Sequence, residues 1–438
     1  MTTNELATSE SKDRRYLVYL IIIALLGWAL ASYDTNLLTL TMPAIAKDLH
    51  LSATTLGVLE FIVFGAEVVV ALFVGYGMDH LGRKRMWMWC LGIAGVFTGL
   101  TFFVTDFWQL ALVRAIASAF AYAELAVSVT LVNEQVPAKR RGFLYSIVQG
   151  GWPVGVFLAS GLYLVVGDLG WRVVYLFGVI PIILVAIGRW KVRESDRFLH
   201  MKSLRVAVKN GDREEISRLQ ALRPMEVDEL KQGSVRQIFA TKGPVRSSLT
   251  RLTITWLLYA MSFVATNVYI AYWLTKVKGW TADEAATLLL ISGGVGFFFY
   301  VLGGVLGEKF GRRNVMIVSG VLVGPLNLAI LLVSGNVWVA IIFFLIYQVT
   351  NGTWSGAGYS YQSEVFPTRV RGTAVGWMGA MQVGGQLLGT AIWIALTATT
   401  SLIITWLIIA VFIGAAQGIS TFFLPNIKPG QELENIIT

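Results

Sequence analysis

Twelve apolar runs of about 20 residues each dominate the sequence. A helix needs about 20 consecutive apolar residues to cross the hydrocarbon core of a bilayer. Six of the runs precede residue 190 and six follow residue 248, and they predict an all-α membrane protein with twelve transmembrane helices. The predicted spans are 16–41, 53–78, 86–104, 108–135, 142–166, 171–190, 249–275, 284–307, 314–334, 336–363, 372–397 and 401–424.

The composition agrees with a membrane protein. Hydrophobic residues make up 55% of the chain and charged residues 14%, against about 25% charged residues in soluble domains. The net charge of +9 does not indicate a nucleic-acid partner, because the basic residues lie between the apolar runs and form no continuous face. Cys90 is the only cysteine, so a disulfide within the chain is excluded. Three scattered histidines, His50, His80 and His200, give no metal-ligand cluster, and we expect no metal and no cofactor.

Two short patterns occur twice, which indicates a duplication. Gly75-x-x-x-Asp79-x-x-Gly82-Arg83-Lys84 recurs as Gly304-x-x-x-Glu308-x-x-Gly311-Arg312-Arg313. Glu134-x-x-Pro137-x-x-x-Arg141-Gly142 recurs 230 residues later as Glu364-x-x-Pro367-x-x-x-Arg371-Gly372. Because both patterns repeat in one order and at nearly one spacing, we expect two pseudo-symmetric six-helix bundles joined head to tail.

The distribution of basic residues predicts the domain organisation and the orientation. Basic residues of most loops fall on one side of a twelve-helix arrangement, which is expected to be the cytoplasm, with both termini on that side. The charged connector between the two sets of six spans, residues 191–248, should be solvated and contain one or two amphipathic helices. No cleavable signal is apparent, because the first apolar run is too long. The predicted parts are a cytoplasmic tail 1–15, a bundle 16–190, a connector 191–248, a bundle 249–424 and a cytoplasmic tail 425–438.

Five of the charged residues inside the predicted spans of the first half are candidates for function. They are Asp34, Glu60, Glu67, Arg114 and Glu124. An ionised side chain at the centre of a bilayer costs about 2.5–3.5 kcal/mol on insertion scales, so each should face a partner or water. Asp34 or Glu124 could carry a proton as its access to water changes, with Arg114 favouring release. The alternative is that these residues form structural ion pairs, and this alternative is favoured for Glu60 near a span end.

The second half offers uncharged polar and aromatic side chains instead. Tyr347, Asn351 and Trp354 follow a spacing that places them on one helix face. Such side chains bind a solute by stacking and hydrogen bonds, although each could equally serve packing. The predicted solute-binding residues are Glu67, Gln149, Asn267, Tyr269, Tyr347, Asn351, Trp354 and Gln382.

Over residues 15–425 the chain resembles transporters of the major facilitator superfamily. The segment Gly75 to Lys84 is similar to the superfamily signature after the second helix, and Glu134 to Gly142 is similar to a pattern of its proton-coupled uptake branches. The resemblance implies a conformational latch on the cytoplasmic side, in which loop residues bond with helix-end pairs. The implied latch residues are Asp79, Arg83, Glu134, Arg141, Glu308, Arg312, Glu364 and Arg371.

A narrower resemblance concerns the fourth helix. Arg114, Glu124 and Glu134 at intervals of ten, with Asp34 on the first helix, resemble the metabolite, sialate and aromatic-acid proton symporters, and Trp171-Arg172 also resembles the sugar porters. The resemblance implies that Asp34 and Glu124 carry protons and that Arg114 modulates them. Some of these relatives have an arginine where this chain has Glu67, so a neutral or cationic solute stays open.

The expected function is proton-coupled import of a small polar organic metabolite by alternating access. An organic acid is favoured, followed by a sugar or polyol and then an organic cation. Drug export is less favoured, because Gly151-Trp152-Pro153-Val154-Gly155 lacks most glycines of the exporter motif Gly-Pro-x-x-Gly-Gly. A transport-dead sensor acting through the connector is a further alternative.

An enzyme is not expected, because no nucleophile and base set appears. The expected partners are a small-molecule substrate, protons and the lipid bilayer of a cell (inner or plasma) membrane. We expect a monomer and no nucleic acid.

Overall fold

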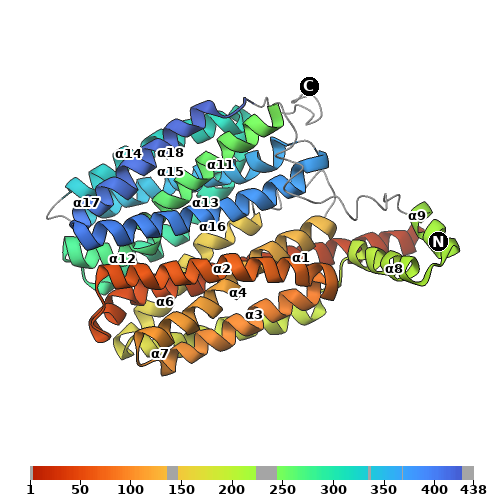
Figure 1. Cartoon of the computed structure of the whole chain (residues 1–438), viewed down its shortest axis with the longest axis horizontal. Coiled ribbons are helices and arrows are strands. Elements are labelled where there is room, and N and C mark those ends of the chain that lie inside the picture. The colour runs from red at the N-terminus through yellow and green to blue at the C-terminus, as the bar shows by residue number, and fades with distance from the viewer. Residues whose placement is uncertain (1–2, 136–146, 223–243, 334–336, 367, 427–438) are drawn as a thin grey trace.

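Two helical bundles make up the molecule (Figure 1). The computed structural model describes residues 3–135, 147–222, 244–333, 337–366 and 368–426. All regular elements among these residues are helices, and twelve of the helical segments are long and apolar enough to cross a membrane. The prediction of an all-α membrane protein with twelve transmembrane helices is therefore confirmed.

The first bundle is built from six long helices. The first of them already begins at Thr3, so the helix runs through most of the segment predicted as a tail. The six are α1 (Thr3–Asp48), α2 (Ala53–Leu81), α3 (Arg83–Leu100), α4 (Phe107–Gln135), α6 (Gly151–Val166) and α7 (Trp171–Gly188).

The second bundle repeats this plan with two helices interrupted. Four helices are continuous, namely α13 (Ala282–Phe310), α14 (Arg312–Leu332), α15 (Val337–Glu364) and α16 (Thr368–Thr399). The other two contain π-helical turns. They are α11 (Pro244–Phe263) with the turn Val264–Val268, α12 (Ile270–Trp273) and the turn Leu274–Lys278, and α17 (Leu402–Trp406) with the turn Leu407–Ile413 and α18 (Gly414–Ser420).

The π-helical turns change the face that a span presents. The Tyr269 N–H donates to the carbonyl oxygen of Val264, five residues back, at 3.1 Å. Each such bond adds one residue to the turn and rotates the following side chains relative to a regular helix. The sequence predicted 249–275 as one uninterrupted span, and periodicity alone carries no signal for this insertion.

Glycines let three helices meet closely across the two bundles. A side chain at Gly155 of α6 would collide with the backbone of α1 at Ala29. A side chain at Gly293 of α13 would collide with the α6 backbone at Pro153 and Phe157. Since α13 belongs to the second half, α6 is packed against both its own bundle and the opposite one.

The bundles also meet where α2 begins and α16 ends, and we call this contact the far seam. The Trp393 indole N–H donates to the Ala53 carbonyl oxygen at 3.2 Å, and the hydroxyls of Thr54 and Thr397 lie 3.3 Å apart. Gly57 admits the Trp393 and Ile394 side chains against the α2 backbone. The far seam, defined by residues 53–57 and 393–397, is therefore closed in this structure.

At the opposite end, the connector is tied to the turn between α2 and α3. Gly82 has φ +102°, a conformation that side chains disfavour. The Glu194 carboxylate accepts the backbone N–H groups of Arg83 and Lys84 and so caps the free donors at the start of α3. The Arg83 guanidinium lies over the Phe198 ring at 4.9 Å and donates to the Met78 carbonyl oxygen.

The second copy of the pattern forms an ion-pair cluster. Arg312 donates to both carboxylate oxygens of Glu364, at 3.0 and 3.2 Å, and lies 3.4 Å from Glu308. These contacts join the resemblance-implied latch residues of the second half. In the first half the side chains of Asp79 and Glu134 and all of Arg141 lie outside the described residues, as does the side chain of Arg371.

The described part of the connector contains two short helices, in agreement with the one or two that the sequence predicted. They are α8 (Asp196–Asn210) and α9 (Arg213–Leu222), which pack through Leu204, Ala207 and Leu219. Ser195 caps α8 by accepting the Phe198 N–H. Both helices lie beyond the bundles, beside the N-terminal part of α1 (Figure 1).

Cysteines placed at both 54 and 397 should form a disulfide. The hydroxyls of the native Thr54 and Thr397 are 3.3 Å apart. The only native cysteine, Cys90, is buried and will not compete for disulfide formation. Mild oxidation of Thr54→Cys/Thr397→Cys followed by mass spectrometry of the linked peptides checks this. Each single variant is the control, and absence of the linked peptide would contradict the closed far seam.

Candidate functional site

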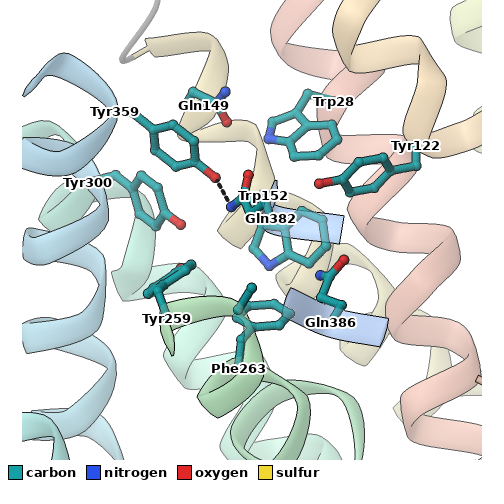
Figure 2. A pocket seen from close by; sticks show the side chains of 11 residues that line it. Trp28, Tyr122, Gln149, Trp152, Tyr259, Phe263, Tyr300, Tyr359, Gln382 and Gln386 are labelled. Carbon is teal, nitrogen blue, oxygen red and sulfur yellow. Dashed lines mark hydrogen bonds between the residues drawn. The ribbon is translucent and has the colours of Figure 1, made fainter. Parts of the chain in front are cut away.

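A pocket lies between the two bundles and is lined by both. The empty space among its lining atoms is about 390 Å³, which includes open solvent. Seven aromatic rings and three glutamines surround it (Figure 2), and none of the described residues that line it is charged. The lining residues are Trp28, Tyr122, Gln149, Trp152, Tyr259, Ala260, Phe263, Tyr300, Tyr359, Gln382 and Gln386.

Two of the predicted solute-binding residues line this pocket, Gln149 and Gln382. The Gln382 amide donates to the Tyr359 hydroxyl at 2.6 Å (Figure 2). The rings of Trp28 and Trp152 are 5.2 Å apart and form one wall. The sequence did not single out these aromatic residues, because aromatic residues are frequent throughout the spans and only the packing selects those that face the centre.

The other predicted residues of the second half lie around the pocket rather than along it. Trp354 stacks on Tyr259 with ring centroids 4.7 Å apart, so it supports a wall residue. Tyr269 stacks in the same way on Trp393 at the far seam. The Tyr347 hydroxyl donates to Thr266, to which the Asn267 amide also donates. Asn351 is buried, and its carbonyl oxygen accepts the Ser355 hydroxyl.

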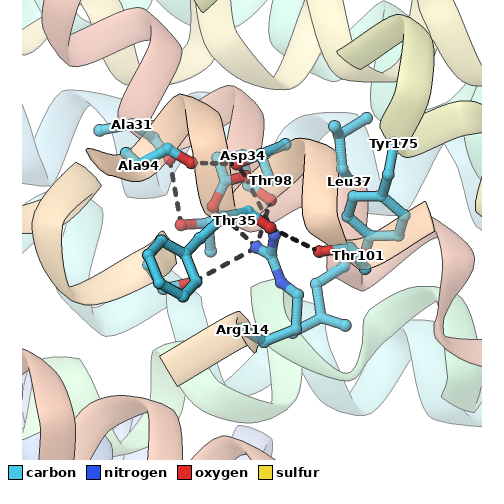
Figure 3. Close-up of polar contacts among 12 residues, drawn as sticks. Ala31, Asp34, Thr35, Leu37, Ala94, Thr98, Thr101, Arg114 and Tyr175 are labelled. Carbon is cyan, nitrogen blue, oxygen red and sulfur yellow. Dashed lines mark hydrogen bonds and ion pairs between the residues drawn. The ribbon is translucent and has the colours of Figure 1, made fainter. Parts of the chain in front are cut away.

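Asp34 and Arg114 form a fully buried ion pair (Figure 3). The two terminal nitrogens of the Arg114 guanidinium donate to the carboxylate, at 2.7 and 3.1 Å, and the Thr98 hydroxyl donates to it at 2.6 Å. Arg114 also lies 5.1 Å from the centre of the Tyr175 ring. This bidentate geometry is the strongest pairing that a carboxylate finds in a protein. Arg114 therefore compensates the negative charge of Asp34.

Glu124 has a different partner, Arg189. The two side chains are fully buried and in contact, and the indole N–H of Trp87 and the hydroxyl of Ser128 donate to the same carboxylate oxygen at 2.6 Å. The Arg189 guanidinium lies over the Trp87 ring at 4.1 Å. The sequence predicted Arg114 as the modulator of both Asp34 and Glu124, and gave no role to Arg189. The signal was available, because Arg189 lies inside the predicted span 171–190.

The pair of Asp34 and Arg114 joins α1 to α4, whereas the pair of Glu124 and Arg189 joins α4 to the end of α7. Asp34 belongs to α1, and Gly27 of α1 lies directly over the second pair, where any side chain would collide with Arg189 and Glu124. Ten helical residues separate Arg114 from Glu124, which corresponds to about 15 Å along α4. The two pairs are thus separate: the first holds α1, which carries the pocket residue Trp28, against α4, and the second holds α4 against the end of α7.

Glu60 and Glu67 of α2 are buried, with exposed fractions of 4% and 3%. Neither belongs to an ion pair among the described residues, and Glu67 does not line the pocket. One carboxylate oxygen of Glu67 has no hydrogen-bond partner. The prediction that Glu67 binds the solute is therefore not supported by a position in the wall of this pocket.

Breaking the Glu124 and Arg189 pair from one side should cost more than removing both charges. Arg189→Met leaves a buried, unpaired carboxylate and should lower the free energy of unfolding by about 3–5 kcal/mol, whereas Glu124→Gln/Arg189→Met should lose less. Denaturant unfolding of the purified protein measures this. The partly exposed pair of Arg172 and Asp48 is the control, because Arg172→Met should cost about 0–1 kcal/mol. A double variant as unstable as the single one would contradict the account.

The sequence matches the family model of the Major Facilitator Superfamily over residues 24–390 and 252–435. A niacin transporter of Acinetobacter baylyi is 25% identical over 82% of this chain and 83% of its own length. A cis,cis-muconate transport protein of the same organism is 26% identical over 85% and 84%. The glucose transporter GlcP of Staphylococcus epidermidis is 26% identical over 97% of both chains.

Solved structures agree on the fold. The xylose transporter XylE from E. coli superposes with a TM-score of 0.74 at 18% identity, over 96% of this chain and 99% of the other. Because the family model, the twelve helices and the central pocket coincide, this chain belongs to the Major Facilitator Superfamily and is a multi-pass membrane transporter of small molecules, not an enzyme.

Proposed function

We propose that the protein is a proton-coupled secondary active transporter that imports a small polar organic metabolite by alternating access. The buried pair of Asp34 and Arg114 is the observation that carries the proposal. A carboxylate and a guanidinium without exposed surface are stable only while paired. A proton that binds Asp34 replaces the pairing and unlocks α1 from α4, so protonation and helix movement are linked.

The proposed cycle uses the two bundles as rigid halves around the central pocket. The far seam is closed in this structure, and we propose that this end faces the outside, because the loops at the opposite end carry most basic residues. The pair of Arg312 with Glu364 would then hold the cytoplasmic ends of its bundle together. Glu124 would be a second proton carrier, controlled by Arg189.

The pocket supports a ring-shaped or conjugated solute with hydrogen-bonding groups. Its aromatic walls stack on planar groups, while glutamine amides and tyrosine hydroxyls donate and accept hydrogen bonds. Because the described residues that line the pocket include no cation, a solute carboxylate would accept hydrogen bonds from neutral donors there. A proton on Asp34 leaves the charge of Arg114 uncompensated, which favours an anion in the low-dielectric interior. We therefore propose a small organic acid, as in the niacin and muconate relatives.

A sugar is the second candidate. Rings flanked by amides and hydroxyls, without a charged lining residue, also suit a neutral polyol, and a glucose transporter is among the relatives. An organic cation is less well served, because no acidic side chain lines the pocket.

Asp34→Asn should abolish proton-driven accumulation and keep solute exchange across vesicles. The amide has the shape of the protonated acid but cannot release a proton, so binding and rocking continue without coupling. Uptake into liposomes under an imposed acid gradient, compared with counterflow, measures both activities. The exposed Asp283 of α13 provides the matched control, Asp283→Asn, which should resemble the wild type. Normal accumulation by Asp34→Asn would refute the assignment.

Thermal unfolding in the presence of solutes should identify the class. A ligand at about 100 times its dissociation constant stabilises the fold by roughly 2.7 kcal/mol, and we expect this from nicotinate or cis,cis-muconate rather than from glucose or choline. Gln382→Leu should weaken binding at least tenfold, since a hydrogen bond to a charged group contributes about 1.5–3 kcal/mol and about 1.4 kcal/mol corresponds to a factor of ten. Gln109→Leu, at the exposed start of α4, is the control. Stabilisation by glucose alone would establish the second candidate, and by choline alone would reject both.

A further inference from the structure

Three buried carboxyl groups of the first bundle lie near a single arginine. Asp34, Glu60 and Glu67 are at most 4% exposed, and Arg114 is fully buried. Glu60 interacts electrostatically with Arg114, and Glu67 interacts electrostatically with both Glu60 and Asp34. Arg114 is committed to Asp34 by two hydrogen bonds. One guanidinium neutralises one carboxylate, so two negative charges would remain if all three acids were ionised.

Glu67 is the least compensated of the three. The charged groups that bear on it are Glu60 from α2 and Asp34 from α1, both acidic, and the described parts of α4 and α16 add no cation that pairs with it. One of its carboxylate oxygens is buried without a hydrogen-bond partner. An ionised carboxylate in this position would lose its hydration without a cation or a full set of hydrogen bonds to compensate, which is strongly unfavourable. A neutral carboxylic acid avoids that cost.

The position of Glu67 connects it to the movement of the bundles. Helix α2 packs on α4 of its own bundle and on α16 of the other, and its first turns form the far seam. Glu60 lies seven residues nearer to the seam on the same face of α2, about 10 Å along the axis. The Tyr269 ring, close to Glu60, stacks on the seam residue Trp393. When the far seam opens, water can therefore approach Glu60 first and Glu67 next.

We propose that Glu67 is a further proton-binding site of the transport cycle, which takes up a proton while the far seam is open, holds it in the closed arrangement described here and releases it when the opposite end admits water. The inference rests on proton-coupled transport as proposed above and adds a carrier that lies outside both ion pairs. A proton reaches Glu67 from the far side while the seam is open, and the neutral acid then permits α2 and α16 to close. The charge carried per cycle is consequently larger by one proton than Asp34 and Glu124 alone would supply.

The first test compares thermal unfolding of wild type and Glu67→Gln in detergent at about pH 5 and about pH 8. The folded protein holds the proton that the unfolded chain releases at neutral pH, so rising pH destabilises the wild type through this group. The amide removes that dependence. Glu67→Gln should therefore gain melting temperature over the wild type at the higher pH and gain less at the lower pH. The exposed Glu214 of α9 gives the matched control, Glu214→Gln, which should follow the wild type at both.

The second test observes the proton directly. The infrared carbonyl band of a protonated carboxylic acid at neutral pH should lose intensity in Glu67→Gln, and Glu67→Ala supplies the same subtraction if the amide is not tolerated. An unchanged band, together with an unchanged pH dependence of unfolding, overturns the proposal.

A transport measurement separates this inference from the function on which it rests. In liposomes, Glu67→Gln should move one proton fewer per solute than the wild type. A wild type that moves solute without protons would refute the proposed coupling. A wild type that couples normally, with the same proton to solute ratio in Glu67→Gln, would refute only the role of Glu67.

Discussion

The cost of burying charge away from water shapes the first bundle of this protein. Asp34 with Arg114 and Glu124 with Arg189 are completely enclosed, and each pair is surrounded by further donors or an aromatic ring. Such pairs contribute little net stability compared with apolar packing, but breaking one of them is expensive. They therefore define discrete arrangements of α4 with α1 and with the end of α7, which is the property that a switching element requires.

The two halves share a fold and differ in chemistry. The first bundle contains the buried acids and arginines, whereas the second contributes Tyr259, Phe263, Tyr300 and Tyr359 to the pocket together with glutamines of α16. Duplication thus produced two similar scaffolds whose interiors diverged. The division places proposed proton chemistry on one side of the pocket and most of the proposed solute contacts on the other, so movement between the bundles affects both at once.

Much of the polar site could be recognised from the sequence because a charge in an apolar run stands out. Asp34, Arg114 and Glu124 were identified for this reason, and all three are buried and paired. Arg114 was expected to act on both acids and pairs with Asp34, whereas the partner of Glu124 was missed, because residues on one helix reveal a shared face but not which neighbouring helix approaches it. Arg189, near the end of its span, belongs to the pair that sequence reasoning did not find.

The sequence by itself determined the class of protein, the twelve spans and the twofold plan, since these depend on local hydrophobicity and repeated motifs. The tertiary structure alone decided which aromatic side chains face the pocket, which arginine meets Glu124, and that one buried carboxylate oxygen of Glu67 has no hydrogen-bond partner among the described residues. Those outcomes depend on how helices rotate and cross. Glycine contacts and π-helical turns set that geometry over distances that no single segment of sequence encodes.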